Sequence, residues 1–211
     1  LQSGTLDIAS VNADDAAVLE GQYDIYNSPQ NMVQIFAMNN SVAPFDDVRV
    51  RQAINYALNQ QEIIDVVLEG RDQVANSVMN INIPGYSEEI TGYSQDLEKA
   101  KALMAEAGYP DGYDLRITVN TKYPTSLTIA TAVQAQMAEA GIRVEIEQVD
   151  SAAWTDMKKN GGVTCGIGNW YVDYNDPDSM LYPVSDGRVD LEFHLLAQRR
   201  IQAADDRWCA D

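Results

Sequence analysis

A short run of polar and aromatic residues near the end of the chain carries the residue types best suited to binding a small solute. Within eight positions it holds Asn169, Trp170, Tyr171, Asp173, Tyr174, Asn175 and Asp176. Aromatic rings offer large rigid contact area, and a carboxylate among them can pair with a cationic group at low local dielectric. The residues alone leave a second reading open. In it, the rings seal the edge of the core and residues 176–178 form a turn.

Groups that could support catalysis or bind a metal are scarce. The single histidine, His194, lies between Phe193 and Leu195, which favours packing over ligation. Zinc sites need about four ligands, and neither a G-x-S-x-G elbow nor a phosphate-binding loop is present. Asp173 and Asp176 are the one carboxylate pair that could divide acid and base roles, and both fit a turn better. We therefore expect no catalytic residue, no metal, no cofactor and no enzyme activity.

The charge balance excludes another class of function. Asp and Glu number 32 against 14 Lys and Arg, a formal net charge of -18. A nucleic-acid-binding protein needs a basic footprint, so this chain should not bind nucleic acid. An acidic surface that keeps a secreted protein soluble is the simpler explanation. Cys165 and Cys209 fit one disulfide in an oxidising compartment and two buried thiols equally well.

The first half of the chain predicts a mixture of elements. We expect a strand at residues 5–9, a helix at 14–20, an extended run at 23–26 and a buried strand at 32–38. Apolar residues at helical spacing predict a helix that begins after Asp46 or Asp47, and Asn59 should cap a second one ending at 68. Residues 71–93 have no sustained period and predict a long loop. Asp96 should cap the next helix.

The second half predicts a regular alternation of strands and helices. Strands are expected at 115–119, 142–146 and 163–167, with helices at 130–140 and 151–159, and a further helix in the tail from 189 to 211. Such crossovers are right-handed and make the strands parallel. Charged residues alternate along these strands, so one face of the sheet should be partly uncovered. A ligand should lie at the carboxyl ends, formed by residues 120–122, 149–150 and 169–171.

Three stretches, in this order, resemble a known family. They are PFDDVRVRQAINYALN at residues 44–59, DLEKAKALMAEAGYPDGY at 96–113 and WYVDYNDP at 170–177. Together they are similar to the signature of the family 5 extracellular solute-binding proteins, which serve peptide- and nickel-type ABC importers. The resemblance implies an α/β fold, namely a lobe of the type II periplasmic-binding-protein kind with a small, partly parallel sheet flanked by helices. It also implies that the two diagnostic helices are scaffold.

The resemblance further implies a protein of two lobes that closes on a solute outside the cytoplasm. Residues 1–31 would end the first lobe, 32–39 form a hinge strand, 40–183 form the second lobe and 184–211 lead towards the return hinge. Asp173 would pair with the free ammonium group of a peptide and Trp170 would wall the pocket, with Asn169 a weaker candidate. Tyr171 and Tyr174 complete the expected binding set.

The same resemblance implies partners and a location. We expect a monomer in the periplasm, or a cell-surface lipoprotein, that delivers a peptide or another small solute to a membrane ABC permease. A non-peptide solute stays open as the alternative, whether a sugar, a glutathione-like compound or a metal chelate, because Trp170 and Tyr171 would suit sugar stacking as readily as a peptide.

Overall fold

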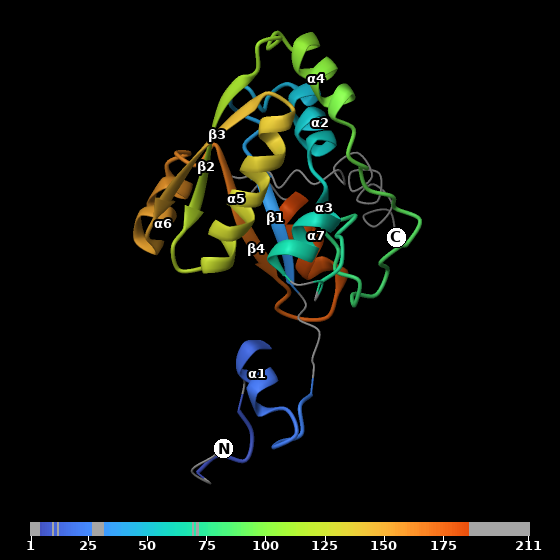
Figure 1. The fold of residues 1–211 in the computed structure, drawn as a ribbon, viewed down its shortest axis with the longest axis vertical. Helices are drawn as coiled ribbons and strands as arrows, with labels where there is room; N and C mark the ends of the chain where they lie inside the picture. Colours follow the sequence, from blue (N-terminus) through green and yellow to red (C-terminus); the bar gives the residue numbers. More distant parts are fainter. Residues whose placement is uncertain are drawn as a thin grey trace. The chain divides into compact units, whose positions relative to one another are not determined.

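The computed structural model describes residues 5–9, 11, 13–26, 32–68, 70 and 72–185 of the chain. The chain divides into two compact units, Leu1–Gln30 and Asn31–Asp211, each of which is considered by itself (Figure 1). The predicted tail helix at 189–211, His194 and Cys209 lie outside the described residues.

The described part of the first unit contains one helix, α1 (Ala13–Leu19), close to its predicted bounds. An isolated bridge joins Glu20 and Tyr23, but residues 24–26 of the expected extended run form no strand. The strand predicted at residues 5–9 was wrong, because these residues form neither helix nor strand. Leu6 and Ile8 are 58% and 88% exposed. A strand is stable only when its backbone groups pair with a neighbour, and the described part of this unit offers residues 5–9 none.

The second unit is built on a sheet of four strands in the order β1-β4-β2-β3. The strands are β1 (Met32–Met38), β2 (Tyr113–Asn120), β3 (Ile142–Val149) and β4 (Cys165–Tyr171). β2 runs parallel to both β3 and β4, as predicted, whereas β1 is antiparallel to β4. The expected small, partly parallel sheet is therefore confirmed.

Six helices accompany the sheet in the described residues of this unit. They are α2 (Val48–Ala57), α3 (Gln60–Val67), α4 (Leu97–Glu106), α5 (Pro124–Glu139), α6 (Ser151–Lys159) and α7 (Pro177–Ser185). Asp47, Asn59 and Asp96 accept backbone N–H groups at the starts of α2, α3 and α4, as their side-chain types predict. None of the helices in the described ranges has both the length and the apolar character that crossing a membrane requires.

One face of the sheet, here the first face, carries the main core. Ile117 of β2, Ile142 of β3 and Ile167 of β4 lie in it together with Val133 and Met137 of α5. Helix α5 packs on β2, β3 and β4, as it does in front of the sheet in Figure 1, and α2 packs on both α4 and α5. The stripes of apolar residues at helical spacing thus cover this face.

The opposite, second face is covered only in part. Val33, Ile35 and Ala37 of β1 form a smaller apolar cluster there with Val78 and Ile83 of the 72–93 loop and Met180 of α7. The loop contains no helix or strand, as predicted, yet it supplies core residues.

Farther along the second face, the side chains change from apolar to charged. At Gly166 of β4 the ring of Trp154 from α6 approaches so closely that a Cβ would lie 2.9 Å from it. On β2 and β3, Arg116 pairs with Glu145 across 3.4 Å and Arg143 pairs with Asp114. The predicted partly uncovered face is therefore confirmed, and these exposed ion pairs account for the charged residues on parallel strands.

Candidate functional site

The carboxyl ends of β2 and β4 and the start of β1 lie at the same edge of the sheet, because Met32 of antiparallel β1 pairs with Tyr171 at the end of β4. Two polar residues predicted for this edge are engaged by the fold. Asn120 Oδ1 accepts the N–H of Lys122 at 3.0 Å and the hydroxyl of Ser151 at 3.2 Å. Asp150 Oδ1 caps α6 by accepting two backbone N–H groups. Both residues shape the edge more than they offer free groups to a ligand.

The segment Asn169, Trp170 and Tyr171 lies inside β4, which corrects the prediction that it follows the strand. It pairs with Gln34, Val33 and Met32 of β1. Side chains alternate between the two faces of a strand, so Asn169 and Tyr171 share one face while Trp170 lies on the other. The candidate residues do not converge on a single point.

Asn169 and Tyr171 lie on the first face, where Asn169 Nδ2 donates to the hydroxyl of Tyr171 at 3.3 Å and contacts Met32 Sδ at 3.6 Å. Tyr171 is 51% exposed, so its ring is available to a ligand at the edge. Gln34 lies directly opposite Asn169 in the ladder. These residues form a polar and aromatic row at the end of the strand pair.

Trp170 and Asp173 come together on the other side, at the first turn of α7. The indole of Trp170 packs against the small apolar cluster and its Nε1–H donates to the carbonyl of Ser179 at 3.3 Å. The backbone N–H of Asp173 donates to the hydroxyl of the same serine at 3.0 Å. Asp173 is exposed, and its carboxylate forms no hydrogen bond or ion pair with any residue that the structure describes.

Tyr174 lies beside the acidic start of α7. Its hydroxyl donates to Asp178 Oδ2 at 3.3 Å. Loss of solvation raises the pKa of the Tyr174 phenol, and the neighbouring carboxylate of Asp178 raises it further. Asp176 Oδ1 accepts the N–H of Asp178 at 2.9 Å, so residues 176–178 begin a helix instead of making an isolated turn.

Two residues of this region, Ser179 and Gln34, were not singled out from the sequence. Ser179 had a usable signal, since an Asp-Pro pair with proline at the first helical position marks a helix start, after which a serine in the first turn is well placed to bond the preceding loop. Gln34 had no such signal in the local sequence, because its neighbours depend on the pairing of β1 with β4, more than 130 positions away. Local pattern cannot reveal such contacts.

The side chain of Gln34 has an unusual environment. Its carbonyl oxygen Oε1 is buried and accepts no hydrogen bond from any part of the chain that the structure describes. A buried acceptor without a donor costs about 1–3 kcal/mol. We expect Gln34→Met, which keeps the length of the side chain and removes the amide, to raise the free energy of unfolding by about 1 kcal/mol in urea denaturation.

Gln136 provides the matched control for that substitution. It is also largely buried, but it accepts the N–H of Asn59 at 2.9 Å and donates to Glu62 Oε2 at 3.0 Å. Gln136→Met should therefore lower the free energy of unfolding by about 1–3 kcal/mol. Equal destabilisation by both substitutions would contradict the assignment of Gln34 as unsatisfied.

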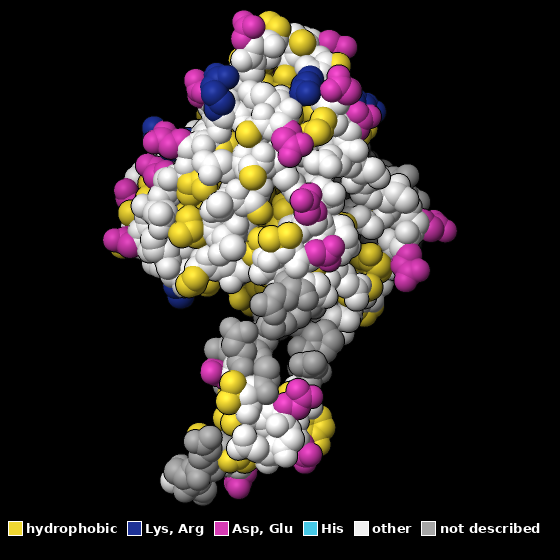
Figure 2. Space-filling view, in the orientation of Figure 1, with side chains coloured by type: hydrophobic (Ala, Val, Ile, Leu, Met, Phe, Trp, Pro, Cys, Tyr) yellow, Lys and Arg dark blue, Asp and Glu magenta, His cyan; other side chains and the backbone are white. Residues whose placement is uncertain are grey.

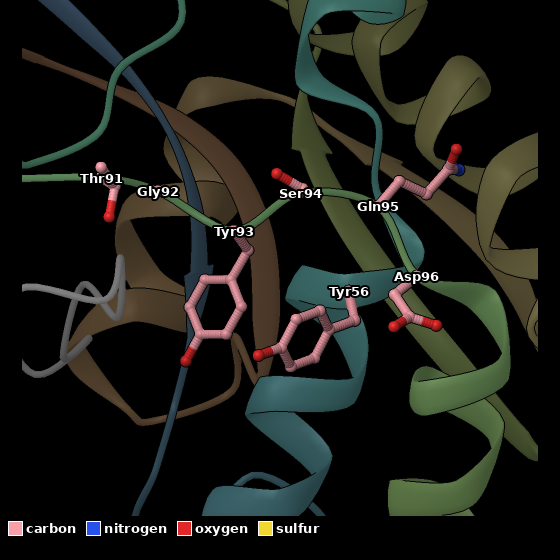
Figure 3. Close-up of a pocket in the computed structure, with 7 residues that line it drawn as sticks. All are labelled: Tyr56, Thr91, Gly92, Tyr93, Ser94, Gln95 and Asp96. Atoms are coloured by element: carbon pink, nitrogen blue, oxygen red, sulfur yellow. The ribbon is translucent and has the colours of Figure 1, made fainter.

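A depression of about 480 Å³ lies elsewhere on the second unit, lined by Tyr56 and residues 91–96 (Figure 3). The rings of Tyr56 and Tyr93 meet edge to face, with their centroids 4.7 Å apart. Tyr56 packs against a small cluster that includes Ala140, which comes just before β3 begins, so the depression lies near the amino ends of the parallel strands. It is not at the edge where a ligand is expected.

Several polar groups of this depression already have partners. Lys99 Nζ donates to the hydroxyl of Tyr56 at 2.8 Å, and this bond raises the pKa of the lysine. Asp96 Oδ1 accepts the N–H of Lys99, and Gln95 Nε2 donates to the carbonyl of Ala57 at 3.1 Å. Burial, and secondarily the neighbouring Tyr56, raises the pKa of Tyr93. The arrangement connects α2 to α4 and leaves few groups for a solute.

On the face of the second unit seen in Figure 2, carboxylates are scattered among uncharged side chains. No group of three or more His, Cys, Asp or Glu side chains in the described ranges could hold a metal ion. Cys165 is buried without a disulfide partner among those residues, and burial raises the pKa of its thiol well above the usual value. The strand-end edge with Asp173 is therefore the candidate site.

Comparison with known proteins finds relatives both by sequence and by structure. The chain is 34% identical to heme-binding protein A of Haemophilus influenzae over 191 residues, 87% of this chain and 35% of that protein. It is 30% identical to the glutathione-binding protein GsiB of Salmonella choleraesuis over 192 residues, 87% of this chain and 37% of the relative. The periplasmic binding protein DppA of Helicobacter pylori, solved with the peptide STSA, superposes with a TM-score of 0.69 at 30% identity, covering 76% of this chain and 32% of that one.

The chain thus spans about a third of the length of these relatives. The structural likeness confirms the predicted α/β lobe of the type II periplasmic-binding-protein kind. The relatives are solute-binding proteins of transport systems, and the predicted extracytoplasmic location is confirmed by their family. The model of the family "bacterial extracellular solute-binding proteins, family 5 Middle" matches residues 1–190, and the chain belongs to that family.

Proposed function

We propose that this chain carries the solute contacts of one lobe of an ABC importer's binding protein, and that the solute is a peptide with a free amino group. The observation that carries the proposal is the carboxylate of Asp173. It is exposed at the strand-end edge and has no partner among the described residues, and its backbone N–H and the indole N–H of Trp170 both donate to Ser179. A carboxylate next to an aromatic wall can pair with an ammonium group, and enclosure by a second lobe would strengthen the pair by lowering the local dielectric.

The remaining candidate residues have complementary roles in this proposal. Tyr171 supplies an exposed ring at the end of β4, and Asn169 orients that ring through its hydrogen bond to the phenol. Tyr174 supports the start of α7 through Asp178. None of these residues is proposed to perform catalysis.

The proposal extends to the full-length protein. Residues 1–31 belong to the first lobe, 32–39 form a hinge strand, 40–183 form the second lobe and 184–211 lead to the return hinge. The full-length protein acts as a monomer that closes on its solute and delivers it to a membrane permease. A lipid anchor at the cell surface is one of its two proposed locations, the periplasm being the other.

A thermal-shift screen of the full-length protein tests the solute class. Its arms are dipeptides, oligopeptides, glutathione, haem and other metal chelates, and oligosaccharides. Ligand binding to the native state alone stabilises it by mass action, about 2.7 kcal/mol at a ligand concentration one hundred times Kd. We expect the peptides to raise the melting temperature.

The relatives make the other arms of the screen informative, since one is a heme-binding and one a glutathione-binding protein. A shift with haem or oligosaccharides and none with any peptide would overturn the peptide proposal while leaving the family unaffected. A shift with glutathione and with peptides would fit one amine-recognising site, because glutathione also carries a free ammonium group.

A further inference from the structure

Ser179 makes three hydrogen bonds with the end of β4 and the residues that follow it. It is the third residue of α7 and is only 6% exposed. Its hydroxyl accepts the N–H of Asp173 at 3.0 Å and its carbonyl accepts the indole N–H of Trp170 at 3.3 Å. Its own N–H donates to the carbonyl of Asp176 at 3.2 Å. One buried residue therefore connects both ends of the Trp170–Asp173 segment to the helix.

The helix that carries Ser179 is itself fixed to the core. Met180, the next residue, is 1% exposed and lies in the apolar cluster with Val33 and Ile35 of β1 and Val78 and Ile83 of the loop. Well-packed side chains in single rotamers transmit position from one element to another. The packing of Met180 against the sheet thus fixes where the Ser179 hydroxyl lies, and the hydrogen bond to that hydroxyl fixes the backbone of Asp173.

Asp173 would otherwise have little to hold it. Its side chain is exposed, and among the described residues its backbone N–H donates to the Ser179 hydroxyl while its carboxylate forms no hydrogen bond or ion pair. A turn that moves freely must be ordered by the ligand at the moment of binding, and that ordering lowers affinity. A turn that is already held spares the ligand this cost.

We infer that Ser179 is a positioning residue for solute recognition, whose hydroxyl holds the turn between Trp170 and Asp173 so that the carboxylate stands ready for the ligand's ammonium group. The inference rests on the proposed function, since it concerns the same site. Ser179 does not touch the solute. It acts through the backbone of Asp173.

The test uses the full-length protein with trialanine and N-acetyl-trialanine as probes in titration calorimetry. Ser179→Ala should weaken trialanine binding about threefold to tenfold, the equivalent of one neutral hydrogen bond. It should leave the acetylated peptide unaffected, since that ligand has no ammonium group to pair. Ser179→Thr keeps the hydroxyl and should restore the affinity for trialanine. Ser179→Cys, a weaker acceptor of similar size, replaces the alanine variant if that variant does not fold.

A double-substitution cycle separates positioning from general support. In an Asp173→Asn background, Ser179→Ala should cause no further loss, because the two residues act through one carboxylate. Equal loss for both probes, or losses that add to those of Asp173→Asn, would overturn the inference and assign Ser179 a purely structural role. Unchanged trialanine affinity in Ser179→Ala would overturn it as well. A wild-type protein that does not prefer trialanine to its acetylated form would instead refute the proposed function, and the inference with it.

Discussion

Asp173→Asn in the full-length protein should weaken the binding of free-amine peptides by about 2–5 kcal/mol, because the substitution leaves the ligand's ammonium group enclosed without a counter-charge. The carboxylate of Asp173 has no partner among the described residues, so its removal breaks no ion pair within the fold. The melting temperature without ligand should therefore change little. N-acetylated peptides should bind wild type and variant alike. Titration calorimetry with both peptide forms measures the effect.

Asp178→Asn is the matched control for this prediction. Asp178 lies five positions away on the same acidic segment, and it accepts a hydrogen bond from the exposed Tyr174. The control makes the same change of charge near the site without removing the proposed contact, so it should cost about 0–1 kcal/mol in affinity. If the two variants lose affinity equally, the general negative charge of the segment attracts the peptide, and Asp173 has no specific role.

Most elements of the second unit could be predicted from local sequence. Side-chain oxygens at Asp47, Asn59 and Asp96 accept N–H groups in the first turns of their helices, which makes helix starts readable from residue type. The alternation of Leu115 and Ile117 with polar residues follows from a strand that buries one face. These signals lie within a few residues of the features that they predict.

The end of β4 could not be predicted in the same way. Asn169, Trp170 and Tyr171 are strand residues because their backbones pair with β1, which precedes them by more than 130 positions. Without that partner, an aromatic and polar run resembles a loop. The error had a consequence for the site, since a strand sends Trp170 and Tyr171 to opposite faces while a loop could bring them together.

The sequence predicts where the candidate site lies in the fold and one carboxylate within it, but it does not predict how the residues of the site are arranged. The rule that ligands lie beyond the carboxyl ends of parallel strands predicts the edge, and the family resemblance predicts Asp173. The contacts that hold Asp173 come from Ser179, whose helix is anchored through Met180 to β1 and to the 72–93 loop. A loop without periodicity gives no sign in the sequence that Val78 and Ile83 are core residues.

Phe45→Ala should lower the free energy of unfolding of this chain by about 3–5 kcal/mol, the range for removing a fully buried aromatic ring. Phe45 is 0% exposed and lies in the main core cluster, between the end of β1 and the start of α2. It belongs to the stretch at residues 44–59 that is most typical of the family. A loss of this size is a large fraction of the 5–15 kcal/mol that stabilises ordinary domains. Urea denaturation followed by circular dichroism measures it, with an unchanged slope expected.

Val48→Ala tests whether that cost arises from burial. Val48 belongs to the same stretch but is 50% exposed, so its truncation should cost less than about 1 kcal/mol. Phe45 belongs to the same core cluster as Met38, which lies at the opposite end of β1 from Met32 and the candidate site. Full-length Phe45→Ala should therefore bind trialanine normally at temperatures where it stays folded. A folded Phe45→Ala protein with weakened binding would mean that the diagnostic stretch contributes to the site, whereas normal binding with reduced stability assigns the stretch to the scaffold that holds Asp173 in place.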